Sequence, residues 1–142
     1  MKPFKIIKFW LFDLDNTLYS AKTKVFDQVD KRMSQYISEK LNVNLEEARR
    51  IQKGYFYEYN TTLNGLIKNH KIDANEFLDF VHDINIDFLK KNVQLSEELK
   101  KLDGKKIIFT NGSRKHAINI TKKIGIDQHF DDIFDIIDSE FI

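Results

Sequence analysis

The sequence predicts an α/β protein built on a parallel sheet, and three observations support this fold class. Residues 6–12, Ile-Ile-Lys-Phe-Trp-Leu-Phe, are nearly all large, aromatic or β-branched, which is typical of a strand buried on both faces. Two more strand-like runs follow segments with helical periodicity. Asp13 and Asp15 come directly after the first run, where open α/β sheets bind their ligands. We expect parallel strands at residues 6–13, 105–110 and 133–137.

The Asp13-Leu-Asp15 segment offers two carboxylates for catalysis. Alternate residues of an extended chain point the same way, so both carboxylates can address one small volume. One can attack phosphorus to give an aspartyl-phosphate, while the other protonates the leaving oxygen and later deprotonates water. A magnesium ion would hold the negative charges together.

Asp13 and Asp15 have two other possible roles, in a calcium-binding loop or in a solvated turn. A calcium-binding loop starting at Asp13 needs Gly at its sixth position and Glu at its twelfth, but the sequence has Leu18 and Lys24 there. The calcium interpretation therefore fails. These residues alone do not distinguish a catalytic pair from a turn of solvated carboxylates at the end of the strand.

A helical segment lies between the first two predicted strands. Apolar residues recur every four positions at Val25, Val29, Met33, Ile37 and Leu41, which predicts one amphipathic helix. Asn44 with Glu47, and Asp73 with Glu76, resemble helix-starting capping boxes. The spacing predicts that further helices begin at these two places.

The middle of this helical segment concentrates aromatic residues at positions 55–59. Tyr55 and Tyr59 could stack on a nucleobase, although the same spacing also fits residues of a hydrophobic core. Thr62 follows in a Thr-Thr pair that can alternatively cap a helix.

The second predicted strand runs into Thr110, Asn111, Gly112 and Ser113, and a helix follows. The Thr110 hydroxyl, the backbone N–H groups of the turn and the helix dipole together could bind a phosphate group. Alone this signal is weak, because Asn-Gly is a common turn sequence.

Together, the segments Phe12–Leu18 and Phe109–Ser113 resemble the first two signature motifs of the haloacid dehalogenase-like hydrolase superfamily. Residues 55–66 and 77–84 resemble the cap of the bacterial pyrimidine 5′-nucleotidase group. The resemblance covers essentially the whole chain. It implies a three-layer Rossmann-like core at residues 1–17 and 101–142, incomplete in this chain, with a helical cap at residues 18–100.

The resemblance also implies roles for individual residues. Asp13 would be the nucleophile and a Mg²⁺ ligand, and Asp15 the general acid/base with its backbone carbonyl on the metal. Thr110 and Asn111 would bind the phosphoryl group. The expected substrate is a pyrimidine nucleoside 5′-monophosphate, and the substrate contacts in the cap would be Tyr55, Tyr59 and Thr62.

Two alternatives to a nucleotidase remain open. One is a phosphatase for another small metabolite, such as a sugar phosphate or phosphoglycolate. The other is a non-catalytic fragment or binding module, because the family's Lys-Pro motif and its later acidic motif do not occur before the last residue, Ile142. We therefore expect the 142-residue chain to be a weak phosphatase that self-associates through the free edge of its first strand.

The composition narrows the class of partner. The 142 residues carry a formal net charge of +1, which gives no electrostatic reason to expect nucleic acid or an anionic membrane as a partner. The absence of cysteine excludes disulfides and is compatible with a cytoplasmic protein. Lysines interrupt the apolar N-terminal run, so we do not expect a signal peptide. The four histidines lack metal-ligand spacing; they are His70, His82, His116 and His129.

Overall fold

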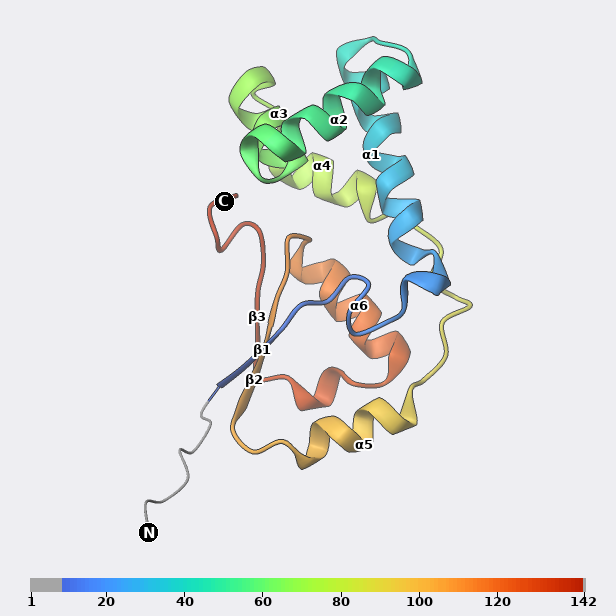
Figure 1. Cartoon of the computed structure of the whole chain (residues 1–142), viewed down its shortest axis with the longest axis vertical. Helices are drawn as coiled ribbons and strands as arrows, with labels where there is room; N and C mark the ends of the chain where they lie inside the picture. Colours follow the sequence, from blue (N-terminus) through green and yellow to red (C-terminus); the bar gives the residue numbers. More distant parts are fainter. Residues whose placement is uncertain (1–8, 142) are drawn as a thin grey trace.

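The computed structural model describes residues 9–141 as a three-stranded parallel sheet beneath a group of helices (Figure 1). The strands are β1 (Phe9–Phe12), β2 (Lys105–Phe109) and β3 (Asp132–Phe134), in the spatial order β1-β2-β3. The α/β class and the three parallel strands are thus confirmed. Residues 6–8 of the predicted first strand lie outside the described residues.

The third strand is shorter than predicted, because residues 135–137 leave the sheet. The Asp135 carboxylate accepts hydrogen bonds from the backbone N–H groups of Arg114 (3.0 Å) and Asp138 (2.9 Å). Ile136, only 1% exposed, packs among the buried residues of the helical group above the sheet. The apolar residues within 135–137 are therefore explained by burial of Ile136 in a turn and not by a strand.

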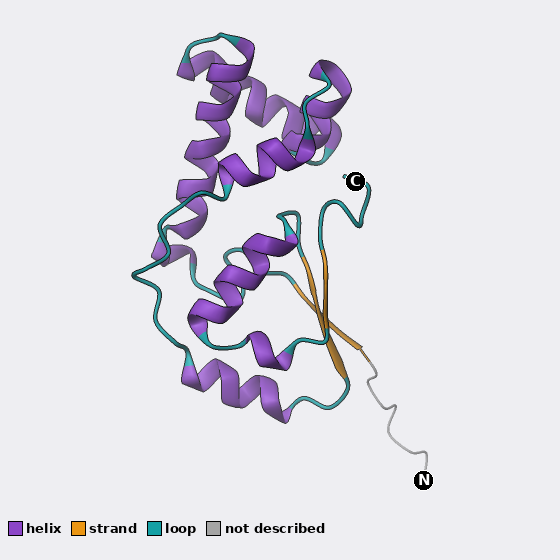
Figure 2. Ribbon diagram, turned by 180° about the vertical axis from the view of Figure 1, so that it is seen from behind, coloured by secondary structure: helices purple, strands orange, loops and turns teal. Residues whose placement is uncertain are grey.

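Two helices cover one face of the sheet, as Figure 2 shows from behind. They are α5 (Val93–Lys101) and α6 (Arg114–Ile124). Alternate residues of each strand face these helices, including the fully buried Ile108. Gly125 ends α6 in the left-handed conformation (φ 78°), which a glycine adopts more readily than other residues. We call the sheet with α5 and α6 the sheet unit; its buried core comprises Leu14, Leu18, Tyr19, Val25, Leu89, Leu99, Ile108, Ala117, Ile120, Ile124 and Ile126.

The other face of the sheet is exposed in the described residues. Phe9 is 59% exposed and Leu11 is 68% exposed. On the neighbouring strands, Phe109 and Phe134 are also exposed, and their rings stack 5.3 Å apart. An apolar surface therefore continues across all three strands.

Four helices form the cap: α1 (Val25–Leu41), α2 (Leu45–Tyr59), α3 (Thr62–His70) and α4 (Ala74–Val81). Their core includes Ile37, Leu66 and Phe77, each at most 2% exposed. The predicted helix over residues 25–41 is confirmed. So are the predicted helix starts, since Asn44 accepts a hydrogen bond from the Glu47 N–H and Asp73 from the Glu76 N–H.

The chain passes between the two units through residues 13–24 and 82–92. The first passage includes a short 3₁₀ helix, Ala21–Thr23, and a second one follows α6 at Asp127–His129. The Gln28 side chain on α1 is hydrogen-bonded to both backbone groups of Asn85, which ties the passages together. The range proposed for the cap, residues 18–100, stays a prediction, and α5 within it contributes Leu99 to the core of the sheet unit.

Among residues 9–141 the structure has no helix that is both long and apolar enough to cross a membrane.

Candidate active site

A cavity of about 400 Å³ lies between the cap and the carboxyl ends of the strands. The predicted residues Asp13, Asp15 and Asn111 line it from the sheet unit, and Thr62 lines it from the cap. Gly112 of the predicted phosphate-binding turn also lines it, as do Gln52, Phe56 and His82, for which the sequence predicted no role in the site. Residues from both ends of the sequence therefore meet in one site.

The turn after β1 orients Asp13. Leu14 is fully buried in the core of the sheet unit, and the N–H groups of Thr17 and Leu18 both donate to its carbonyl. Asn16 takes the left-handed conformation (φ 59°), which suits an asparagine better than most residues. The tight turn brings the Thr17 hydroxyl to 2.7 Å from Asp13 Oδ2, to which it donates.

Asp15 is held by two buried partners. The Tyr19 hydroxyl donates to Asp15 Oδ1 at 2.5 Å, and His116 Nε2 lies 2.9 Å from the same oxygen. Burial raises the pKa of Asp15, but the hydrogen bond and charge of His116, with the Tyr19 hydroxyl, outweigh it and lower the pKa below its usual value. Burial and the adjacent Asp15 charge raise the pKa of Tyr19, which therefore stays a donor.

The His116 ring is stacked on His82, with ring centroids 4.1 Å apart and planes 10° from parallel. His82 is the C-cap residue of α4, whereas His116 lies in the first turn of α6. Burial, and then the charge of His116, lower the pKa of His82 to about 3, so this ring is neutral at pH 7. Spacing along the sequence could not have predicted the pair, because its members come from different units.

The predicted phosphate-binding turn is fixed by backbone bonds on both sides. Thr110 is buried; its N–H donates to the carbonyl of Phe134 and its hydroxyl accepts from the Gly112 N–H, both at 3.0 Å. The Ile136 N–H donates to the Gly112 carbonyl at 3.2 Å. Asn111 and Gly112 line the cavity, whereas Thr110 lies behind them and positions the turn.

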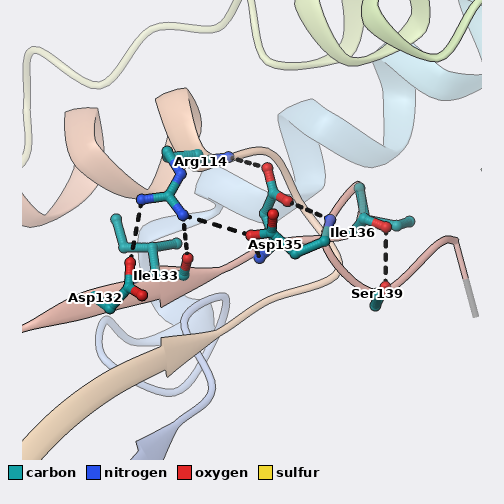
Figure 3. Close-up of polar contacts among 7 residues, drawn as sticks. Arg114, Asp132, Ile133, Asp135, Ile136 and Ser139 are labelled. Carbon is teal, nitrogen blue, oxygen red and sulfur yellow. Dashed lines mark hydrogen bonds and ion pairs between the residues drawn. The ribbon is translucent and has the colours of Figure 1, made fainter.

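Figure 3 shows how the start of α6 is attached to the segment after β3. The Arg114 guanidinium is paired with Asp132 and donates to the carbonyl of Ile133. Its backbone N–H donates to Asp135, and the Ser139 hydroxyl donates to the carbonyl of Ile136. These contacts attach the start of α6, and with it the Asn111-Gly112 turn that lines the cavity, to the segment after β3.

The donor set is compatible with magnesium. Mg²⁺ prefers oxygen ligands, and it is usually bound by one or two carboxylates together with water and phosphate oxygens. The Asp13 carboxylate and the Asp15 backbone carbonyl could supply two such oxygens. Within residues 9–141 no group of three or more His, Asp or Glu side chains could hold a metal ion, so a bound Mg²⁺ would depend on water and substrate oxygens as well.

On α2, the face with Gln52, Lys53 and Phe56 lines the cavity, and the face with Tyr55 and Tyr59 does not. The Tyr55 hydroxyl is 2.7 Å from His70 Nε2 on α3, and its ring packs edge-on against Tyr59. The structure therefore brings only Thr62 of the three predicted substrate residues to the cavity wall. Its hydroxyl donates to the Gln52 carbonyl at 3.0 Å.

The cap wall also carries a buried polar network around Gln52. Gln52 Nε2 donates to Asp30 Oδ1 at 2.7 Å, and the Ser34 hydroxyl donates to Gln52 Oε1 at 2.5 Å. Burial raises the pKa of Asp30, but hydrogen bonds from Lys53 and Arg49 lower it overall. The far end of the cavity thus combines an aromatic ring with fixed polar groups.

Comparison with known proteins agrees with this geometry. Residues 7–142 match the family model described as haloacid dehalogenase-like hydrolase. Phosphate metabolism protein 8 of Saccharomyces cerevisiae (strain ATCC 204508 / S288c) is 36% identical over 137 residues, which cover 89% of this chain and 42% of that protein. The chain therefore spans less than half the length of this curated relative.

Proposed function

The chain belongs to the haloacid dehalogenase-like hydrolases, and we propose that within this family it is a phosphomonoester hydrolase that works through an aspartyl-phosphate on Asp13. The observation that carries the proposal is the meeting of two carboxylates and a Thr-Asn-Gly turn in one cavity. The predicted acid at Asp15 argues against dehalogenation, because a departing halide needs no proton.

The reaction would proceed in two steps. A carboxylate oxygen of Asp13 attacks phosphorus, the bond from phosphorus to the ester oxygen breaks, and the protonated form of Asp15 gives its proton to that oxygen, so an alcohol leaves. Because the pKa of Asp15 is lowered, this protonated form is the minor one at neutral pH. Water then attacks phosphorus, Asp15 takes a proton from the water, and the bond from phosphorus to the Asp13 oxygen breaks. Inorganic phosphate leaves, and both carboxyl groups are regenerated.

The turn at residues 110–113 would bind the phosphoryl oxygens through backbone N–H groups at the start of α6. Asn111 lines the cavity and would present its N–H, while Thr110 supports the turn from behind. Mg²⁺, when bound at Asp13 and Asp15, would neutralise the charge of the phosphate and the carboxylates.

We propose a nucleoside 5′-monophosphate, and by resemblance a pyrimidine one, as the substrate. A cavity of about 400 Å³ extends from Asp13 to the cap, which is ample for a group larger than phosphate. Phe56 offers a ring surface there, and the Gln52 network offers polar atoms. The cytoplasmic location stays a prediction.

An assay of a substrate panel tests both parts of the proposal. With Mg²⁺ present, UMP and CMP should be hydrolysed faster than ribose 5-phosphate and phosphoglycolate, and EDTA should abolish turnover. Asp13→Asn should reduce kcat by about a thousandfold or more, because it removes the nucleophile. A preference for the two smaller esters contradicts the nucleotide assignment, and full activity of Asp13→Asn contradicts the mechanism.

The alternative of a non-catalytic binding module gives a different result. Such a protein would bind UMP, measured by calorimetry, without releasing phosphate over many hours. Release of phosphate that depends on both Mg²⁺ and Asp13 excludes this alternative.

A further inference from the structure

The two hydrogen bonds to Asp15 both end on one of its oxygens. Oδ1 accepts from the Tyr19 hydroxyl and from His116 Nε2, and the partners come from residues four and 101 positions away. Among the described residues, Oδ2 has no hydrogen-bond partner in the structure. A carboxylate rotates about its Cβ–Cγ bond, so two bonds to Oδ1 fix the position of Oδ2 as well.

Both partners of Asp15 are themselves held rigidly. Tyr19 is 5% exposed and His116 is 3% exposed, and both lie inside the sheet unit or at its edge. His116 lies in the first turn of α6, where its backbone N–H donates to the side-chain oxygen of the N-cap residue Ser113 at 3.1 Å. Neither side chain can move away from Asp15 without disturbing this packing.

The cap braces His116 from the other side. His82 stacks on its ring, and His82 Nδ1 lies 3.2 Å from the Ser113 hydroxyl. Gly112 permits this approach, since a Cβ at that position would lie only 3.3 Å from His82 Nε2. A residue at the end of a cap helix therefore supports the side chain that holds Asp15.

The direction of the bond from His116 follows from the acceptor at Asp15. Oδ1 accepts hydrogen bonds both when the carboxyl is ionised and when it carries its proton on Oδ2, so His116 Nε2 must carry the proton that points to Oδ1. The ring then donates at Nε2 whether it is neutral or protonated.

We propose that Tyr19 and His116, with His82 stacked on His116, are positioning residues that hold Asp15 Oδ1 so that Oδ2 performs the proton transfer. This inference rests on the proposed function. In the first step the proton on Oδ2 passes to the ester oxygen as the P–O bond breaks. In the second step Oδ2 takes a proton from the attacking water.

Comparing two esters whose leaving groups differ in their need for a proton can distinguish residues that position the acid from residues that only stabilise the fold. Nitrophenolate leaves without protonation, whereas the ribose oxygen of UMP needs a proton. The kcat/KM value reports only steps up to the transfer of phosphate to Asp13, provided that this transfer is irreversible. His116→Leu should therefore lower kcat/KM for UMP by about a hundredfold and leave kcat/KM for p-nitrophenyl phosphate largely unchanged.

Two further variants strengthen this test. Tyr19→Phe keeps the buried ring and removes only the hydroxyl, so it provides the answer if His116→Leu does not fold. His116→Gln retains an N–H donor and should recover part of the UMP activity. The matched control is His129→Gln, because His129 is bonded to Ser96, 2.7 Å away, and does not line the cavity. It should affect neither ester.

Nitrogen NMR of the chain with labelled histidines identifies which ring nitrogen of His116 carries the proton, and this measurement does not depend on enzyme activity. We expect the proton of His116 on Nε2, with a signal that shifts in Asp15→Asn and not in His129→Gln. A proton on Nδ1 alone, or an equal loss of activity toward both esters in His116→Leu and Tyr19→Phe, would overturn the positioning role. If the wild-type chain hydrolyses neither ester, the proposed function itself fails.

Discussion

The cap and the sheet unit differ in how completely they bury their own apolar residues. The cap closes around Ile37, Leu66 and Phe77 with four helices of its own. The sheet unit buries one face of its strands under α5 and α6, and leaves Phe9 and Leu11 exposed on the other. Yet β1 has the composition of a strand that is covered on both faces.

This difference shows that an apolar strand composition does not guarantee burial on both faces. The composition of β1 predicts burial on both faces, but the described residues cover only one of them. We propose that the exposed face and the free edge of β1 are where the chain associates with a second copy. The cap has no such open sheet edge.

The largest expected effect comes from the cap core. Phe77→Ala removes a ring that is 2% exposed and should lower the free energy of unfolding by about 3–5 kcal/mol. In the monomer, Leu11→Ala on the open face should change the free energy of unfolding by less than about 1 kcal/mol, because Leu11 is 68% exposed. Urea denaturation measures both. Equal losses in the two variants would show that the open face is buried in solution.

The contact between the two units should make stability depend on pH. His82 has a pKa of about 3 in the folded chain and an ordinary value of 6.5, so below pH 6.5 the unfolded chain binds a proton that the folded chain does not. The free energy of unfolding should therefore fall as pH decreases from 6.5 to 5, by at most about 1.4 kcal/mol per pH unit.

Denaturation at several pH values checks this effect of His82. His82→Gln should flatten the slope between pH 5 and 6.5, and His129→Gln should retain it. The same slope in wild type and His82→Gln would assign the pH dependence to another group.

Loss of one helix cap in each unit tests whether the units unfold together. Asn44 caps α2 in the cap, and Asn92 caps α5 in the sheet unit, each by accepting a backbone N–H bond. Asn44→Ala and Asn92→Ala should each cost about 1 kcal/mol. In calorimetry, a single transition shifted by both variants indicates one cooperative unit, whereas two transitions, each shifted by one variant, indicate independent units.

A substitution on the open face, Leu11→Lys, should have the smallest effect on stability but a clear effect on self-association. Leu11→Lys places a charge on the open face and should change the free energy of unfolding by only about 0.5 kcal/mol. It should shift the chain toward the monomer in light scattering coupled to size-exclusion chromatography. The self-association proposal is wrong if wild type is already monomeric at high concentration.

Local physical signals determined much of this protein from the sequence. The strand runs, the capping residues Asn44 and Asp73, and the stop at Gly125 follow from neighbours within a few residues. Asp13 and Asp15 could be recognised because only Leu14 separates them. The third strand was predicted too long, because an apolar run cannot distinguish burial in a sheet from burial of Ile136 in a turn.

Tertiary structure alone decided which distant groups meet. Helical periodicity gives α2 two faces, but only the packing of α2 on α3 turns Tyr55 toward His70 and leaves Phe56 at the cavity. His116 lies 101 residues from Asp15 in sequence and reaches it because α6 packs on the sheet whose first strand, β1, ends just before Asp13. Sequence spacing does not relate residues that meet only because two units pack together. The stacked pair of His82 and His116 next to Asp15 is therefore evident only from the tertiary structure.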